Sequence, residues 1–434
     1  MNSNSENFDS NNWDVLAPPI NESSGKKIGL NPEQKSLNVG DTSDNKEKIP
    51  EIKYVENFDS MNLKENLLRG IFAYGFETPS KIQQCCIPII SQKHDLIAQS
   101  QAGTGKTGAF TCGVLQIINE QENYTQAIII SPTRELSTQI NAVVNDIGRY
   151  MKLKTTLCVG GISVDNNIKD VKDSHILIGT PGRIYDLIER RAFDVKKVSV
   201  LVMDEADVLL CKEFLIQSKK IITKLDLKSQ ICAFSATLPI ETIDMMNRFM
   251  NKPVNVLVQK EKLSLDLIAQ YYIDVGQDKY KIEVLDDMYK GLSIGQCIIY
   301  VNYKDKAKWL QEKLSEFGHA VEAIHGDLTP LERTNIMKLF RSGDYRVLIS
   351  TDLLARGIDV QQVGYVINYD LPYDPDCYLH RIGRSGRYGK RGAAINFVTK
   401  RDMHTLKMIM SKFQVDIGHM PDPKYLNEYL SEKI

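Results

Sequence analysis

The chain has 434 residues, more than one ordinary hydrophobic core holds, so we expect roughly two to three domains. Hydrophobic residues make up 42% of the sequence, as in soluble globular proteins, and no stretch reaches the roughly 18 apolar residues of a membrane helix. The formal net charge of -1 argues against a protein that coats nucleic acid through bulk positive charge. Any nucleic-acid site must therefore be a local patch.

The first residues carry no basic-then-apolar signal pattern, so we do not expect secretion. The 8 cysteines include the adjacent pair Cys85 and Cys86 but show no spacing typical of metal ligands. They are interpreted as core or half-buried thiols in a reducing compartment.

Composition and hydrophobic pattern divide the chain into four parts. Residues 1–54 are polar with few apolar anchors, and we expect them to be disordered because they cannot bury enough surface to offset ordering entropy. Residues 55–257 and 267–434 each alternate apolar strand-like runs with amphipathic helical stretches, which predicts two α/β domains with parallel sheets covered on both faces. A short charged linker, 258–266, would join them.

The expected elements follow in chain order. In the first domain the strand candidates are Asp95–Ala98, Ala127–Ile130, His175–Ile178, Val198–Met203 and Ile231–Phe234. In the second domain they are Cys297–Val301, Ala320–Ile324, Arg346–Ile349, Tyr365–Tyr369 and Ala393–Val398. Helices are predicted over Lys304–Phe317 and Leu331–Phe340, among others.

The most informative motif is the glycine-rich stretch Ser100–Thr107, which follows a strand and precedes a helix opening at Lys106. Glycines let backbone N–H groups surround phosphate oxygens, and the helix N-terminus favours an anion. Lys106 is expected to reach the β- and γ-phosphates, and Thr107 to ligate Mg²⁺. The remaining cradle residues are Ala102, Gly103, Thr104 and Gly105.

An acidic motif, Asp204-Glu205-Ala206-Asp207, ends the buried run Val198–Met203. In doubly wound sheets the carboxyl end of a central strand lies beside the phosphate loop. We expect Asp204 to hold Mg²⁺, largely through water, and Glu205 to position and deprotonate the attacking water.

A dense basic motif follows in the second domain, where Arg384 and Arg387 repeat at helical spacing beside glycines. A basic run is often a solvated face, but here a phosphate loop in one domain and paired arginines in the other suggest a site completed by closure. Arg384 and Arg387 are the hypothetical arginine fingers, while Gly357 and Asp359 follow a strand end in the same domain.

Together these residues resemble the DEAD-box RNA helicases of superfamily 2, from about Val55 to the C-terminus. The resemblance implies two tandem RecA-like domains, an ATP and Mg²⁺ site, and RNA as partner. Residues 75–83 resemble the family's Q motif, with Phe58 as the isolated aromatic before it. This implies that Gln83 reads adenine and that Phe76 stacks on it, as an amide and an aromatic plane can. Phe58, Phe76 and Gln83 are accordingly assigned to nucleotide binding, with Gly357 and Asp359.

The resemblance further implies residues for coupling and for RNA. Asp207, Ser235, Thr237 and His380 would couple the ATP state to domain closure. The expected RNA-backbone contacts of the first domain are Pro132, Thr133, Arg134, Gly160, Gly161, Thr180, Pro181, Gly182 and Arg183. The second domain would add Asn302, Gly326 and Thr351, with Arg333 supporting that surface.

Within the family the chain is similar to the translation initiation factor 4A subfamily, through residues 57–63, 67–71, 73–77 and 340–343. It departs from the pattern at Ser100, Ser137, Tyr303, Pro330 and the pair Cys211-Lys212. The resemblance implies an ATP-dependent RNA helicase that unwinds short duplexes locally, with translation-factor or ribonucleoprotein partners, no membrane, and a cytoplasmic or alternatively nuclear location. The alternative function is an ATP-gated RNA clamp with little turnover.

Overall fold

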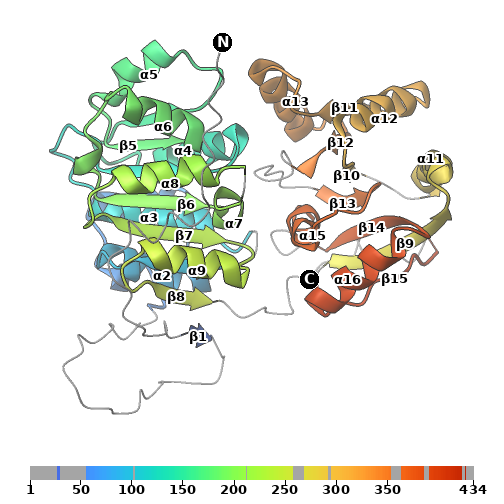
Figure 1. Cartoon of the computed structure of the whole chain (residues 1–434), viewed down its shortest axis with the longest axis horizontal. Coiled ribbons are helices and arrows are strands. Elements are labelled where there is room, and N and C mark those ends of the chain that lie inside the picture. Colours follow the sequence, from blue (N-terminus) through green and yellow to red (C-terminus); the bar gives the residue numbers. More distant parts are fainter. Residues whose placement is uncertain are drawn as a thin grey trace, which may run out of the picture.

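The computed structural model describes residues 55–100, 103–211, 213–257, 268–291, 295–352, 363–385, 391–422 and 426, and the backbone of Lys27–Gly29. These residues form two α/β units that lie side by side (Figure 1). The expected fold of two tandem doubly wound parallel-sheet domains is confirmed. The expected linker, 258–266, lies outside the described residues.

The first sheet has the order β1-β8-β2-β7-β6-β3-β5-β4, and every pairing is parallel. Its strands are β1 (Lys27–Gly29), β2 (Leu96–Gln99), β3 (Ala127–Ile130), β4 (Thr155–Cys158), β5 (Ile176–Gly179), β6 (Val200–Asp204), β7 (Gln230–Ser235) and β8 (Val254–Leu257). Strand β1 comes from the segment expected to be disordered, and it pairs with β8 at the sheet edge. The rest of residues 1–54 lies outside the described residues, so disorder there stays a prediction.

Alternate residues of these strands enter two different cores, as the period of two requires. Ala98, Ile129 and Val202 pack with helices α1 (Glu65–Ala73), α2 (Lys81–Ser91), α3 (Lys106–Ile117) and α4 (Arg134–Ile147). Ile97, Ile128 and Leu201 face the second core with helices α5 (Val164–Val171), α6 (Pro181–Glu189), α7 (Ala206–Leu209), α8 (Leu215–Lys224) and α9 (Ile240–Phe249). Both faces are covered, which explains the nearly continuous apolar strands.

The second sheet has the order β11-β12-β10-β13-β14-β9-β15 and is also parallel throughout. Its strands are β9 (Ile268–Gly276), β10 (Gln296–Tyr300), β11 (Val321–Ile324), β12 (Val347–Ser350), β13 (Val363–Asn368), β14 (Gly392–Thr399) and β15 (Gly418–His419). Helices α11 (Lys281–Gly291) and α12 (Lys304–Glu316) cover one face. Helices α13 (Pro330–Ser342), α15 (Pro375–Ile382) and α16 (Met403–Phe413) cover the other.

Short single-turn helices complete the described part: η1 (Asp59–Met61), η2 (Val195–Lys197) and η3 (Asp278–Tyr280). None of the helices in the ranges given above is both long and apolar enough for a membrane span. None of the eight cysteines, all of which lie in the described part of the chain, forms a disulfide: Cys211 is exposed, Cys377 is half-buried and the rest are buried.

Candidate functional site

The phosphate loop lies between β2 and α3, at the carboxyl edge of the first sheet. Gly103 and Gly105 have φ values of 81° and 98°, a left-handed backbone that glycine adopts without a Cβ penalty. Gly105 is the N-cap of α3, and the helix begins at Lys106 as expected. The Lys106 ammonium is buried and donates to the Ser100 carbonyl oxygen at 2.6 Å, so it folds back over the loop. The Ser100 hydroxyl lies 2.5 Å from that of Thr104 and buttresses the same turn.

Two buried carboxylates end strand β6 beside this loop. Asp204 is 4% exposed and Glu205 is 7% exposed, and Asp204 accepts a hydrogen bond from the Glu205 N–H at 3.0 Å. Burial and the neighbouring Glu205 raise the pKa of Asp204 to about 7, although the Lys106 ammonium opposes the shift. Glu205 has a φ of 53°, an unusual left-handed value for a non-glycine residue. One buried oxygen of Glu205, Oε2, has no hydrogen-bond partner among the described residues.

This arrangement suits a hydrated cation and an anionic substrate. Two adjacent buried acids near one ammonium leave negative charge without full compensation, which a divalent cation would supply. The orphaned Glu205 oxygen can accept a proton or a hydrogen bond from a water. The residues present therefore fit Mg²⁺ together with a nucleotide phosphate.

The expected base-binding residues gather around the start of α3. Gln83 accepts from the Ser80 N–H at 2.8 Å and approaches the Gly105 carbonyl oxygen at 3.4 Å. A Cβ on Gly108 would lie 2.6 Å from the Gln83 amide nitrogen and 2.8 Å from the Phe76 ring, so only glycine permits this approach. Phe58 is 1% exposed and stacks on Phe76 with ring centroids 6.4 Å apart. Phe58 thus lies in the core behind Phe76, and Phe76 is the ring that remains partly exposed.

A junction between the two domains adjoins the acids. His380 Nε2 lies 3.1 Å from Asp207 Oδ2, and the Thr237 hydroxyl donates to the same oxygen at 2.5 Å. His380 Nδ1 lies 3.8 Å from the orphaned Oε2 of Glu205. Ser235 holds Thr237 through the Thr237 N–H at 3.3 Å. All four expected coupling residues therefore meet at one place, and only His380 comes from the second domain.

A second interdomain contact lies between α4 and α13. The Arg333 guanidinium is 3.2 Å from the Glu135 carboxylate, and both side chains are largely buried. Arg134, beside Glu135, donates to the Gly160 carbonyl oxygen at 2.5 Å. Glu135 and Arg333 thus link the surfaces that carry the expected RNA residues of both domains.

In the first domain the expected RNA residues lie at the carboxyl edge of neighbouring strands β3, β5 and β4. Thr133 caps α4 by accepting from the Leu136 N–H at 3.2 Å, and Thr180 precedes Pro181 at the first position of α6. Two helix N-termini therefore open at the same edge, where backbone N–H groups favour phosphate. The loop that follows β4 holds the exposed Gly160 and the left-handed Gly161 with φ 82°. Of the neighbouring expected residues, Gly182 is exposed at this edge, whereas Pro132 is buried.

Arg183 faces inward and donates to the Asn167 side chain at 2.6 Å. This contact fixes the start of α6 against α5. Gly182 has open space around the position of a Cβ, so its surface is accessible.

In the second domain Asn302 follows β10 and Thr351 follows β12, again at a carboxyl edge. Asn302 is fixed on three sides. Its N–H donates to Asp370 Oδ2 at 3.2 Å, its amide donates to the Leu371 carbonyl oxygen at 2.9 Å, and its Oδ1 accepts from Arg381 at 2.9 Å. Gly326 is exposed after β11 on the same side of the sheet.

Arg381 is the residue that sequence reasoning missed. Its side chain is completely buried and donates to Asp352 Oδ1 at 2.5 Å and Oδ2 at 2.8 Å, and to Asn368 at 3.1 Å. It also donates to the Asp370 carbonyl oxygen at 2.6 Å. A single guanidinium thus ties together the ends of strands β10, β12 and β13. Its place between His380 and the proposed fingers was visible in the sequence, but its partners are distant in the chain.

Of the two proposed arginine fingers, Arg384 belongs to the described residues and Arg387 does not. Arg384 is 5% exposed and donates to the His380 carbonyl oxygen at 3.1 Å, directly behind the junction. Arg387, Gly357, Asp359 and Ala102 lie outside the described residues.

Two departures from the family pattern have local explanations. The Ser137 hydroxyl lies 2.7 Å from that of Ser131 and donates to the Thr133 carbonyl oxygen, which braces the start of α4. Pro330 is the first residue of α13, where its fixed φ and missing N–H are well tolerated.

Two family models match the chain. The DEAD/DEAH box helicase model covers residues 80–246, and the helicase conserved C-terminal domain model covers residues 280–389. The matched ranges contain the phosphate loop with the acidic motif, and the basic motif, respectively.

Relatives match over both domains. A protein named ATP-dependent RNA helicase eIF4A from Candida albicans is 48% identical over 368 residues, covering 85% of this chain and 93% of its own length. Eukaryotic initiation factor 4A of Caenorhabditis elegans is 46% identical and covers 85% of this chain and 92% of its own length.

Solved structures agree. Dbp5 of S. cerevisiae bound to RNA and ADP BeF3 is 35% identical with a TM-score of 0.82, covering 87% of this chain and all of that one. Mss116p bound to ssRNA and AMP-PNP is 26% identical with a TM-score of 0.78, covering 94% of this chain and 85% of that one.

The chain therefore belongs to the DEAD/DEAH box helicase family. Within that family it is similar to the initiation factor 4A proteins. The family and helicase class expected from the motifs are confirmed.

Proposed function

We propose that the chain is an ATP-dependent RNA helicase that binds single-stranded RNA across its two domains and opens short duplexes locally. The observation that carries the proposal is the junction of His380 with Asp207 and Thr237, 3.8 Å from the orphaned Glu205 oxygen. His380, whose contact with Asp207 depends on how the two domains are arranged, thus lies next to Glu205, the residue proposed to activate water. The names of the relatives support the same function.

In this mechanism ATP is the substrate. The phosphate loop and Lys106 would hold its phosphates, while Phe76 and Gln83 would take the adenine. Thr107 and Asp204 would hold Mg²⁺, largely through water; when bound, Mg²⁺ neutralises charge that develops on the phosphates. Glu205 would accept the proton of the attacking water, and the hydrogen bonds behind it fix its backbone.

The second domain would complete the site. Arg384 and Arg387 would stabilise the transferring γ-phosphoryl group, a contribution worth about 10³–10⁵ in rate. ATP and RNA would each favour the closed arrangement, so each tightens the binding of the other. RNA would be held by its backbone at the helix N-termini of α4 and α6 and at Asn302, Gly326 and Thr351, with little reading of base identity.

The same similarity supports a cytoplasmic role in translation initiation, with translation factors as partners.

A bent single strand cannot remain in an A-form duplex, so local strand separation follows from binding without long-range translocation.

The test is ATP hydrolysis by the full chain with no nucleic acid, with single-stranded RNA and with DNA of the same sequence. We expect strong stimulation by RNA alone, together with separation of a short RNA duplex. Slow turnover with stable ATP-dependent RNA retention would contradict the helicase and identify an ATP-gated clamp instead.

A further inference from the structure

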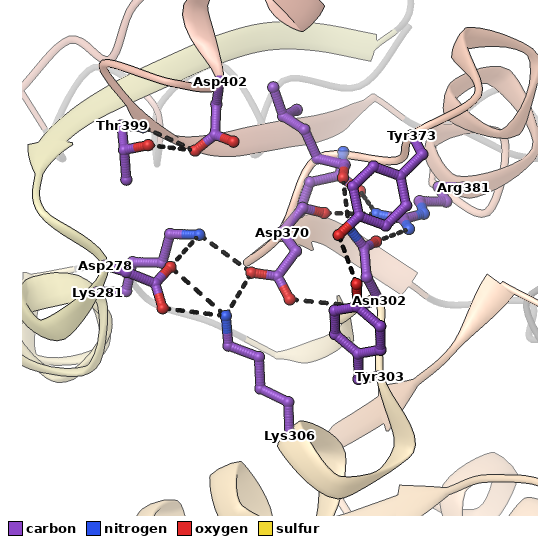
Figure 2. Close-up of polar contacts among 12 residues, drawn as sticks. Asp278, Lys281, Asn302, Tyr303, Lys306, Asp370, Tyr373, Arg381, Thr399 and Asp402 are labelled. Carbon is purple, nitrogen blue, oxygen red and sulfur yellow. Dashed lines mark hydrogen bonds and ion pairs between the residues drawn. The ribbon is translucent and has the colours of Figure 1, made fainter.

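Two tyrosine rings stand exposed beside Asn302 on the second domain. Tyr303 is 59% exposed and Tyr373 is 74% exposed, so the fold buries neither ring. Their hydroxyl oxygens are 2.8 Å apart, and their ring centroids are 6.4 Å apart at an interplanar angle of 64°. Figure 2 shows the two rings joined through their hydroxyls, next to Asn302 and Arg381.

Hydrogen bonds on the buried side of the two rings fix the loops that carry them. Tyr303 follows Asn302 and is the N-cap of α12, while Tyr373 lies two residues after Leu371. The Asn302 amide donates to the Leu371 carbonyl oxygen, which ties one loop to the other. Arg381 holds Asn302 from the buried side.

A charged network supports the same loops. Asp370 Oδ1 accepts from Lys281 at 3.0 Å and from Lys306 at 2.7 Å, and Asp278 pairs with both lysines (Figure 2). The Lys281 and Asp370 side chains are largely buried, so the centre of this network lies in the interior, while Asp278 lies at its exposed end. The tyrosines are therefore presented by a rigid base, which lowers the entropy lost when a ligand stacks on them.

The chemistry of the pair suits a nucleobase. Each hydroxyl already has a partner in the other, and the exposed parts that remain are aromatic. Every nucleobase has a π-face, and stacking on an aromatic side chain tolerates any sequence. Asn302, one residue away, is a proposed contact for the RNA backbone, so a strand held there would bring its bases within reach of these rings.

We infer that Tyr303 and Tyr373 form a stacking platform for one or two bases of single-stranded RNA, beside Asn302 on the second domain. The inference rests on the proposed function, since it extends the same RNA path. The platform would add affinity without adding sequence preference or phosphate contacts. It would also give the second domain a hold on RNA bases in a family site otherwise built from backbone contacts.

The experiment measures ATP-dependent RNA binding by the full chain and by the double variant Tyr303→Ala/Tyr373→Ala. A series of oligonucleotides with one abasic position each locates the stacked base. Stacking is worth about 1–3 kcal/mol per base, so we expect the double variant to bind about 5- to 150-fold more weakly. One or two abasic positions should weaken the wild type similarly and have no further effect on the variant. The salt dependence of binding should be unchanged because no phosphate contact is lost.

Two variants serve as controls. Tyr303→Phe/Tyr373→Phe keeps both rings and should retain most of the affinity. Phe317→Ala removes an exposed aromatic ring at the opposite end of α12 and should bind RNA like the wild type. If the wild type and the double alanine variant bind RNA equally, and each abasic position weakens binding to both proteins to the same extent, the platform is overturned while the proposed helicase function stands. Absence of ATP-dependent RNA binding by the wild type would overturn both proposals.

Discussion

The two domains share one architecture but build their sites in opposite ways. The first places buried acids at a strand end, and the Oε2 atom of Glu205 is left without a hydrogen-bond partner among the described residues. The second places a buried guanidinium, Arg381, at the equivalent edge and surrounds it with acceptors. The polar groups at the edge of the first domain therefore keep hydrogen-bonding capacity for ligands. The polar groups at the edge of the second domain instead bond to one another and fix the loops that follow its strands.

Glu205, the acid with an unsatisfied oxygen, provides the strongest test of this difference between the two domains. Glu205→Gln should lower RNA-stimulated ATP turnover by about 10²–10⁴-fold, because the amide cannot accept the proton of the attacking water. ATP binding should change little, and ATP-dependent RNA binding should persist. Single-turnover hydrolysis and nucleotide binding measure the two effects separately. Turnover near that of the wild type would remove Glu205 from the proposed role.

For Arg381, the buried guanidinium of the second domain, we expect a substitution to lower the stability of the fold. Arg381→Ala removes the donor to the Asn302 and Asn368 amide oxygens and to the Asp370 carbonyl oxygen, besides the ion pair with the partly exposed Asp352. Because each buried acceptor left unsatisfied costs about 1–3 kcal/mol, we expect a loss of about 3–5 kcal/mol in the stability of the second domain. Trp309 lies on α12 in that domain, and its fluorescence during denaturant unfolding provides the readout. Exposed Arg401→Ala on the same domain is a control that should unfold like the wild type. An unchanged midpoint for Arg381→Ala would refute the view of Arg381 as the centre of this edge.

The opposite edge of the first sheet sharpens the contrast, because an acid is used there for structure. Asp95 accepts from the Ile231 N–H at 2.8 Å and the Asn251 N–H at 2.6 Å, joining the starts of β2, β7 and β8. Burial raises the pKa of Asp95 to about 6 from an ordinary 3.8, although these two bonds oppose the shift.

A raised carboxyl pKa means that the folded state binds the proton more tightly than the unfolded state. Its contribution to stability is therefore full below about pH 4 and is lost as the pH rises towards 6. Relative to Asp95→Asn, which does not titrate, the wild type should lose on the order of 2–3 kcal/mol over that interval. Denaturant unfolding of both proteins from pH 4 to 7 measures the difference. A constant difference across this range would contradict the raised pKa.

The smallest expected effect concerns the contact that joins the two domains. His380→Ala removes the second-domain partner of Asp207 and should reduce the mutual enhancement of ATP and RNA binding by about 5- to 150-fold, the usual range of such coupling. Binding of RNA without ATP should be unaffected. The measurement is the RNA dissociation constant with and without a non-hydrolysable ATP analogue. Undiminished coupling would place the link between the domains elsewhere, with the Arg333–Glu135 pair as the next candidate.

Local sequence patterns predicted the elements whose burial is complete. Strand Ala127–Ile130 and the start of α3 at Lys106 agree with the prediction, since a fully buried run and a glycine-rich turn leave few alternatives. Strands β4 and β9 were not predicted, because their residues alternate between buried and partly exposed and include polar side chains. The short strand β1 could not be anticipated, because its pairing with β8 depends on an edge more than 200 residues away in the chain.

By itself, the sequence determined the phosphate loop, the acidic strand end and the repeating strand–helix order, because each depends on residues close together in the chain. Only the tertiary structure decided how the distant parts meet. His380 and Asp207 are 173 residues apart in sequence, and Tyr303 and Tyr373 are 70 apart. The second sheet brings Tyr303 and Tyr373 together by aligning the carboxyl ends of β10 and β13, whereas His380 and Asp207 meet because the two domains pack against each other. A local sequence pattern encodes neither arrangement.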